Sequence, residues 1–253
     1  MAIQLSIDEL YRRWLRYPLW RLLNPAAPYE HFYADIVLRR LRRQGAHDAI
    51  GGAARPIRAA TELLDVMAAH GMRPCHRFID YGCGSLRLGR AVMEYLDPCR
   101  FAGMDVAGEF LDLGLQFIGA ELVAAKRPRL HVISPAALRE AAHWQPDYVG
   151  SWHVCSKVPW RELPRYFASI IGLMHENTQA FIQFPCADRR QRLNHLNWSL
   201  SPAELVSLVA GIDPAISIDF IPLAERNAAG IADSYARLSY RRRRAPRMPV
   251  GLS

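Results

Sequence analysis

The stretch FIDYGCGSLRLGRAVMEYLDP, from Phe78 to Pro98, constrains the fold more than any other part of the chain. It combines a short apolar run, a turn with two glycines and a pattern with helical spacing. This order predicts a buried strand that passes through the turn into a helix. Such a turn brings the backbone close to a ligand, and the flanking residues decide which ligand fits.

Strands and helices are expected to alternate after this turn. Strands are predicted at 77–81, 100–106, 129–134, 147–152 and 179–185, and helices at 86–96, 108–126, 135–144 and 160–174. Repeated strand–helix units indicate a parallel sheet with helices on both faces. Ligands of such sheets bind at the carboxyl ends of the strands, where the glycine turn is placed.

The chain after Pro185 has a different pattern. Residues 186–200 are polar and rich in arginine, which predicts a loop. Ser201, Pro202 and Glu204 predict a helix with a serine cap and proline in its first turn. Segments 215–223 and 233–242 are expected to form an antiparallel hairpin, which completes a seven-stranded, mostly parallel sheet. The basic end of the chain is expected to be a disordered tail.

The N-terminal region is predicted to be helical. Ser6 and Glu9 form a capping-box pattern that starts a helix at Ile7, and Pro18 is expected to end that helix after Tyr17. Further helices are expected at 19–23, 29–44 and 57–70. We therefore divide the chain into a helical extension (1–50), an α/β domain (51–240) and a basic tail (241–253).

Two phosphate-binding patterns fit the glycine turn incompletely. Gly84 and Gly89 have the spacing of a P-loop, but its lysine and hydroxyl residue are missing. Arg90 and Ala91 stand in their places. A dinucleotide-binding turn needs Gly-x-Gly-x-x-Gly, and Arg87 occupies the position of its third glycine, where it would obstruct close helix–strand packing.

A third pattern, acid-x-Gly-x-Gly, fits completely with Asp80, Gly82 and Gly84. An acid before the glycines suits a ligand with a cationic end, and S-adenosylmethionine has an ammonium and a sulfonium but no phosphate. Asp80 is then expected to hold the ammonium, while the glycines let the backbone approach the ligand. A second acid should end the next strand and bind the ribose hydroxyls, and Asp105 is at that place.

With these residues in place, the stretch from Phe78 to Val106 resembles the class I S-adenosylmethionine-dependent methyltransferases. It is most similar to a subgroup whose turn has the sequence Gly-Cys-Gly-Ser-Leu-Arg, and His47–Gly52 (HDAIGG) resembles the segment ahead of that turn. The likeness covers roughly residues 50–185 and the terminal hairpin in outline, but not the first 45 residues. Leu86 departs from it, because many members have a third glycine there. The resemblance implies a Rossmann-like α/β fold.

The resemblance also implies roles for individual residues. Asp105 would bind the ribose, Val106, Ile133 and Ser134 would lie near the adenine, and Ser151 and Trp152 would stand nearest the methyl end. The expected cofactor-binding residues are Asp80, Gly82, Cys83, Gly84, Asp105, Val106, Ile133, Ser134 and Ser151. Trp152 and His153 are the candidates for substrate contact, with His153 also a candidate base, and no metal ligand is expected.

Each of these residues also has a purely structural interpretation. Asp80 and Asp105 would serve as strand-end acids that cap helices, and Cys83 is better explained as a small packing residue than as a nucleophile. Histidine in general titrates near neutrality, as a base requires, but the sequence shows no partner for His153, which favours a structural role. Trp152 is equally well explained as a wall of the substrate site or as core.

Charge and cysteine content limit the other function classes. The formal net charge is +8, and only Lys126 and Lys157 of the 32 basic residues are lysines. The excess lies in the flanks: residues 1–60 have ten arginines against five acids, and residues 186–253 have ten against six. Five cysteines without a Cys-x-x-Cys pair argue against a zinc site or a disulfide framework and predict a reducing, cytoplasmic location. No apolar run approaches the ~18 residues of a membrane span.

The flanks leave two further interpretations. YRRWLRYPLWRLL, residues 11–23, would contact an anionic membrane or nucleic acid, or would pack its apolar face on the domain while its arginines reach water. The arginines at 241–244 would bind phosphates or remain solvated.

We expect an S-adenosylmethionine-dependent methyltransferase that forms S-adenosylhomocysteine. The expected acceptor is an oxygen, nitrogen or carbon atom of a small molecule. The alternatives are methylation of RNA or protein, with the arginine-rich flanks as the nucleic-acid contact, and a non-catalytic domain that serves as a partner protein. The Asn-Pro-Pro-Tyr element of base-amine methylases is missing after the fourth strand, where SWHV stands, which argues against nucleic acid.

Overall fold

The computed structural model describes residues 11, 15–44, 58–193, 197–222, 227–228 and 230–241; for 40–44 and 58–60 it describes the backbone alone. The described helices are α2 (Arg16–Leu23), α3 (Tyr29–Gln44), α5 (Arg58–Ala69), α6 (Arg87–Tyr95), α7 (Gly108–Ile118), α8 (Ala120–Lys126), α9 (Pro135–His143), the 3-10 turn η2 (Cys155–Lys157), α10 (Leu163–Leu173) and α11 (Pro202–Ile212). The strands are β1 (Phe78–Tyr81), β2 (Phe101–Asp105), β3 (Arg129–Val132), β4 (Tyr148–Ser151), β5 (Gln179–Cys186), β6 (Gln191–Arg192), β7 (Trp198–Ser199), β8 (Ile216–Pro222) and β9 (Ala232–Tyr240).

A seven-stranded sheet forms the centre of the described part of the molecule. Its strand order is β3-β2-β1-β4-β5-β9-β8. The first five strands of this order are parallel, and β9 runs antiparallel to both β5 and β8. The expected α/β fold with a terminal antiparallel hairpin is therefore confirmed.

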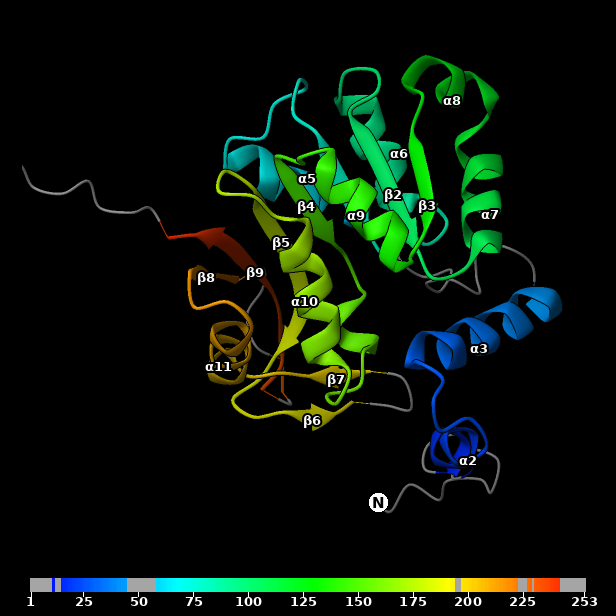
Figure 1. The fold of residues 1–253 in the computed structure, drawn as a ribbon, viewed down its shortest axis with the longest axis vertical. Coiled ribbons are helices and arrows are strands. Elements are labelled where there is room, and N and C mark those ends of the chain that lie inside the picture. The colour runs from blue at the N-terminus through cyan, green and yellow to red at the C-terminus, as the bar shows by residue number, and fades with distance from the viewer. Residues whose placement is uncertain are drawn as a thin grey trace, which may run out of the picture.

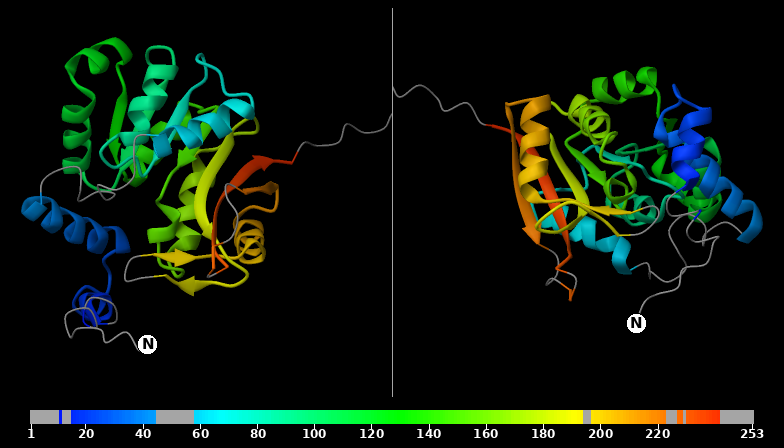
Figure 2. Two further views of the ribbon diagram at one scale, coloured as in Figure 1. Left: turned by 180° about the vertical axis from the view of Figure 1, so that it is seen from behind. Right: turned by 90° about the horizontal axis from the view of Figure 1, so that it is seen from below.

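Helices cover both faces of this sheet (Figures 1 and 2). On one face, α5, α6 and α7 pack on a core that contains Phe78, Phe101 and Phe181. On the other face, α9, α10 and α11 pack on a core that contains Ile79 and Phe184. β1 lies inside the sheet between β2 and β4, and all four of its residues, Asp80 included, are buried, as expected for a parallel strand covered on both faces.

The predicted helix at 108–126 is two helices, which corrects the sequence interpretation. α7 ends at Ile118 and α8 begins at Ala120, and Gly119 between them has φ 83°. This left-handed conformation is open to glycine and ends the first helix. The isolated glycine at 119 therefore marks the boundary between two helices.

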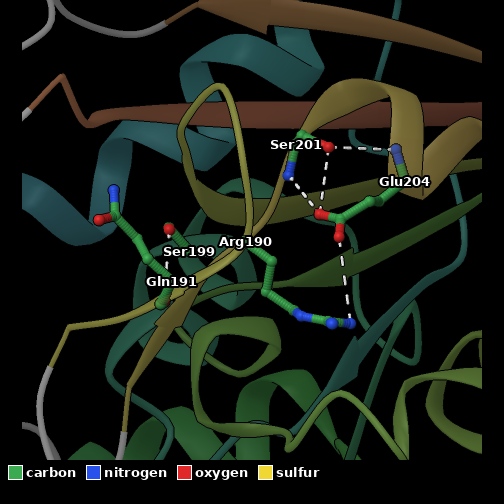
Figure 3. Close-up of polar contacts among 5 residues, drawn as sticks. All are labelled: Arg190, Gln191, Ser199, Ser201 and Glu204. Carbon is green, nitrogen blue, oxygen red and sulfur yellow. Dashed lines mark hydrogen bonds and ion pairs between the residues drawn. The ribbon is translucent and has the colours of Figure 1, made fainter.

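The prediction that residues 186–200 form a loop is wrong for Cys186, which belongs to β5, and for β6 and β7, which pair antiparallel. Ser199 Oγ donates a hydrogen bond to the carbonyl of Gln191 at 3.4 Å (Figure 3). Arg190 lies beside α11, with Nη1 4.0 Å from Glu204 Oε1. Ser201 caps α11 as predicted, and the reciprocal bonds of a capping box join it to Glu204.

Pro18 does not separate two helices in the way we expected. α2 begins at Arg16, so Pro18 is its third residue, where the backbone N–H has no acceptor within the helix and proline is tolerated. Most of the helix predicted to start at Ile7 lies outside the described residues, as do nearly all of the basic tail and the arginines at 242–244.

α2 and α3 form a pair at one end of the molecule (Figure 1). Tyr17 and Trp20 of α2 pack on Tyr29 and Phe32 of α3. Among the described residues, every helix is too short or too polar to cross a lipid bilayer.

Candidate cofactor-binding site

The candidate site lies at the carboxyl ends of β1, β2 and β4. β1 is the first strand along the chain, β2 and β3 extend the sheet on one side of it, and β4 begins the other side. The space at this reversal is where open α/β sheets bind ligands. The turn that follows β1 places Gly82 and Gly84 there, with φ 82° and 51°.

Asp80 is buried within β1 and lacks a hydrogen-bond partner for one carboxylate oxygen. Its side chain is 1% exposed, and Oδ2 has no partner in the described part of the chain. Its neighbours on the adjacent strands are Gly103 and Gly150, whose lack of side chains explains why the sheet supplies no donor. Burial, with the nearby Asp105 carboxylate, raises the pKa of Asp80 to about 8.

Asp105 is the last residue of β2, and its carboxylate is tied to the glycine turn. Oδ2 accepts a hydrogen bond from the Gly84 N–H at 2.6 Å, and Oδ1 accepts one from the Val106 N–H at 2.7 Å. Burial raises the pKa of Asp105 to about 6, and the backbone donors oppose that rise. Two buried acids that lie close together and have raised pKa values are common at functional sites.

Gly82 lies against a residue that the sequence analysis did not single out. A Cβ at this position would collide with the side chain of Val154, which follows β4. The positive φ of Gly82 is a second reason for glycine here. The turn after β1 and the segment after β4 therefore touch at Gly82.

Cys83 is a buried packing residue in the structure. Its side chain is 7% exposed and belongs to the core under α5 and α6. Burial raises the pKa of its thiol well above the ordinary value, so it remains protonated at neutral pH. The position supports our interpretation that it is not a nucleophile.

The residues predicted near the adenine lie around Asp105. Val106 packs against Val37 of α3. The Ile133 N–H donates to the carbonyl of Asp105 at 2.8 Å, which joins the end of β3 to the end of β2. The Ser134 hydroxyl accepts the Ala137 N–H at 3.1 Å and thereby caps α9.

Ser151 ends β4, and its hydroxyl is used within the protein. It donates to the carbonyl of Tyr81 at 2.8 Å and accepts a hydrogen bond from the Tyr166 hydroxyl at 2.7 Å. The side chain is fully buried. Its contribution to the site is therefore to hold the end of β4 against β1 and α10.

Trp152 and His153 follow β4, and their rings are in contact, with centroids 4.3 Å apart and planes tilted by 44°. Trp152 is partly buried against the core under α5 and α6. His153 has φ 57°, a conformation that histidine adopts more readily than most residues. Its N–H donates to Gln183 Oε1 at 3.1 Å, and its carbonyl accepts Lys157 Nζ at 2.7 Å.

Sequence reasoning missed Lys157 and Gln183. Lys157 lies close enough to Asp105 for its charge to lower the pKa of that carboxyl. Gln183 of β5 is buried and joins His153 to Asp233 of β9 through its amide, with Nε2 2.8 Å from Asp233 Oδ1. Lys157 had a signal in the sequence, because it is one of two lysines in a chain whose other basic residues are arginines.

α3 contacts two elements at the carboxyl end of the sheet. Near its start, Glu30 Oε2 lies 3.7 Å from Arg165 Nη1 of α10. Further along, Val37 packs on Ala107 and Phe110 beside β2. The helix therefore links the start of α10 to the start of α7 at this end of the sheet. The segment His47–Gly52, compared above with the region ahead of the turn, lies outside the described residues.

Comparison with known proteins gives matches in structure only. No protein-family model and no curated protein matches the sequence. Magnesium protoporphyrin IX methyltransferase from Synechocystis PCC 6803, solved with S-adenosylmethionine, matches with a TM-score of 0.54 and 13% identity over 94% of this chain and 100% of that one. The chain has the methyltransferase fold.

Two further structures give the same result. The 1,6-didemethyltoxoflavin-N1-methyltransferase of Burkholderia thailandensis, with its substrate and S-adenosylhomocysteine bound, matches with a TM-score of 0.54 and 18% identity over 85% of this chain and 91% of that one. The methyltransferase domain of a bacterial Hen1 matches with a TM-score of 0.55 and 15% identity over 72% of this chain and 98% of that one. At these identities the likeness establishes the Rossmann-like fold.

Proposed function

We propose that this protein is an S-adenosylmethionine-dependent methyltransferase that acts on a small molecule. The observation that carries the proposal is the unpartnered oxygen of Asp80, buried at the end of β1 beside Asp105. A buried carboxyl without a donor is costly unless a ligand supplies one, and the ammonium of S-adenosylmethionine is such a donor. A dinucleotide phosphate at the same place would lie beside two acids, which disfavour a negatively charged ligand.

The residues at this edge fit the whole cofactor. Asp80 would hold the ammonium, and Asp105 would accept the ribose hydroxyls, since a carboxylate that already accepts two N–H groups has further lone pairs. Gly82 and Gly84 let the backbone approach the cofactor, and Val106 and Ile133 would lie beside the adenine. When bound, the cofactor supplies an activated methyl group, which forms a bond to the acceptor atom as its carbon–sulfur bond breaks.

The protein's share of this reaction is orientation and the exclusion of water. Holding an acceptor in line with the methyl group contributes on the order of 7–11 kcal/mol. The ring of Trp152, in contact with that of His153, would orient it, and Gln183 and Lys157 hold the backbone of His153. His153 would take the acceptor's proton only where the acceptor is not already nucleophilic.

The contacts of α3 beside the site support a small acceptor. α3 contacts α10 through Glu30 and Arg165 and packs on the start of α7 through Val37, so it limits the room for a large acceptor at this end of the sheet. A protein or RNA acceptor is our second candidate, supported by the arginines of segment 189–192. All five cysteines lie in described segments and are free, which supports our placement of the protein in the cytoplasm.

Calorimetric titration tests the cofactor assignment. S-adenosylmethionine and NAD are titrated separately into the wild type and into Asp105→Ala. We expect only S-adenosylmethionine to bind, and the substitution to weaken it. Binding of NAD alone, or of neither ligand, would contradict the proposal, and the second outcome would favour a non-catalytic partner protein.

A labelling experiment then identifies the acceptor class. Cell extract is separated into small-molecule, RNA and protein fractions, and each is incubated with the protein and S-adenosylmethionine labelled in its methyl group. We expect label in the small-molecule fraction with the wild type and not with Asp105→Ala. Label confined to RNA or protein would replace the small-molecule acceptor with the second candidate.

A further inference from the structure

α2 presents two different faces, and only one of them packs against other residues that the structure describes. Tyr17 stacks edge-on against Tyr29 of α3 with ring centroids 5.3 Å apart, and Trp20 lies 5.3 Å from Phe32. This aromatic contact attaches α2 to α3. No residue of α2 is fully buried, although six of its eight residues are apolar or aromatic.

The other face of α2 consists of leucines that remain exposed. We call this set, Leu15 at the helix cap with Leu19, Leu22 and Leu23, the leucine face. Its members are 53%, 45%, 76% and 80% exposed. Their spacing puts them within an arc of about 100°, the width of the stripe that a surface helix normally turns toward a core. Here the stripe meets no core of the described chain.

The sequence around the leucine face is cationic. Residues 11–29 contain four arginines and no acid. Arg16 and Arg21 belong to α2 itself, and Arg21 donates a hydrogen bond to the carbonyl of Ala27. Arg12 and Arg13 precede the helix in the sequence. Exposed leucines beside arginines are the composition of helices that lie in the plane of a membrane surface.

We propose that the leucine face of α2 docks on the surface of a lipid bilayer that contains anionic lipids. The leucines would enter the boundary between headgroups and acyl chains, and the arginines would pair with the lipid phosphates. An eight-residue helix is about 12 Å long, far short of the ~30 Å hydrocarbon core, so α2 would lie on the bilayer. α2 stands at one end of the molecule, where nothing described obstructs this approach (Figures 1 and 2).

Two other occupants fit the same face less well. A second copy would bring two arginine-rich segments together, and four side chains expose only on the order of a few hundred Å² against the ~800 Å² per partner of a stable interface. RNA would need several exposed aromatic rings for stacking, but Tyr17 and Trp20 of α2 are packed against α3, and the exposed Tyr11 lies before the helix.

Vesicle co-sedimentation tests the proposal with the full chain. The probes are vesicles of phosphatidylcholine alone and of phosphatidylcholine with phosphatidylglycerol. We expect binding to the anionic vesicles, weakening as salt is raised, and a loss of about tenfold or more with Leu22→Glu. The matched control is Val206→Glu on α11, an apolar residue 44% exposed that acquires the same charge. It is expected to bind as the wild type does.

Two results would overturn the proposal. One is vesicle binding that Leu22→Glu and Val206→Glu weaken equally, or that needs no anionic lipid. The other is an absence of vesicle binding together with a concentration-dependent dimer that Leu22→Glu abolishes in sedimentation velocity, which would assign the face to a second copy. Circular dichroism confirms that each variant is folded, and S-adenosylmethionine binding, unchanged by either substitution, separates this test from the proposed function.

Discussion

The side chain of Leu86, at the end of the glycine turn, fills the space beside Gly114 of α7. A Cβ on Gly114 would lie 2.6 Å from Leu86 Cγ. Leu86 has φ 58°, which leucine rarely adopts, and its side chain is completely buried. Cβ atoms on Gly89 and Gly103 would also approach Leu86, at 3.1 and 3.3 Å. Three glycines thus make room for one buried leucine, whose burial offsets the cost of its backbone conformation.

Gly114→Ala is therefore expected to destabilise the protein by about 1–3 kcal/mol, because the added methyl group overpacks Leu86. The free energy of unfolding is measured by urea denaturation. Gly172→Ala on α10 is the control, since nothing lies within 4 Å of the Cβ position there. It should gain up to about 1 kcal/mol from the helix propensity of alanine. Equal stability of the two variants would show that Leu86 is not tightly enclosed.

The sequence predicted the elements around the turn better than the contacts between them. Asp80, Gly82 and Asp105 follow from a strand, a turn and a second strand that are adjacent in the chain. Arg87 argued against a dinucleotide-binding turn, because an arginine at its third glycine position would obstruct close packing. In the structure the close approach falls at Gly89, whose Cβ would lie 2.9 Å from Phe101 Cζ. Helix phase decides which residue faces the strand, and a motif alone does not give that phase.

Long-range contacts were beyond sequence reasoning for a physical reason. Val154 against Gly82 and Gln183 against His153 join residues that are 72 and 30 positions apart, and only the strand order brings them together. The short pairing of β6 with β7 was missed because two-residue strands have no periodicity to detect.

Asp80 makes stability depend on pH in the cofactor-free protein. Its folded-state pKa of about 8 lies above the ordinary value of 3.8, so the folded state binds more protons than the unfolded chain between these values. The stabilising effect is complete below pH ~4 and is lost as pH rises through ~8. Between pH 6 and 8 we expect the free energy of unfolding to fall by up to about 1.4 kcal/mol per pH unit.

Asp80→Asn isolates this effect, because the amide does not titrate and has nearly the same size. Denaturant unfolding at a series of pH values should show a flatter profile than the wild type above pH 6, where Asp105, with a pKa of about 6, adds little. Asp112→Asn, at an exposed acid of α7, is the control and should keep the wild-type slope. A wild-type slope in Asp80→Asn would mean that another group titrates in this range.

The capping box of α11 is expected to contribute measurably to stability. Ser201→Ala removes the acceptor for the Glu204 N–H and should cost about 1 kcal/mol in urea denaturation. Ser207→Ala, at an exposed position within the same helix, is the control and should be neutral or slightly stabilising. If both variants unfold alike, the hydrogen bonds drawn in Figure 3 contribute little in solution.

His153→Asn separates a structural role of this residue from a catalytic one. Asparagine tolerates the positive φ of this position and keeps the backbone bonds to Gln183 and Lys157, but it has no imidazole. We expect methyl transfer to the labelled acceptor to continue with little change, because the geometry holds His153 by its backbone. A general base would instead be revealed by a loss of about 10²–10⁴-fold together with the loss of one limb of the pH–rate profile. His153→Val tests the backbone conformation alone. Valine cannot easily adopt this φ, so the variant should be less stable whether or not His153 acts as a base.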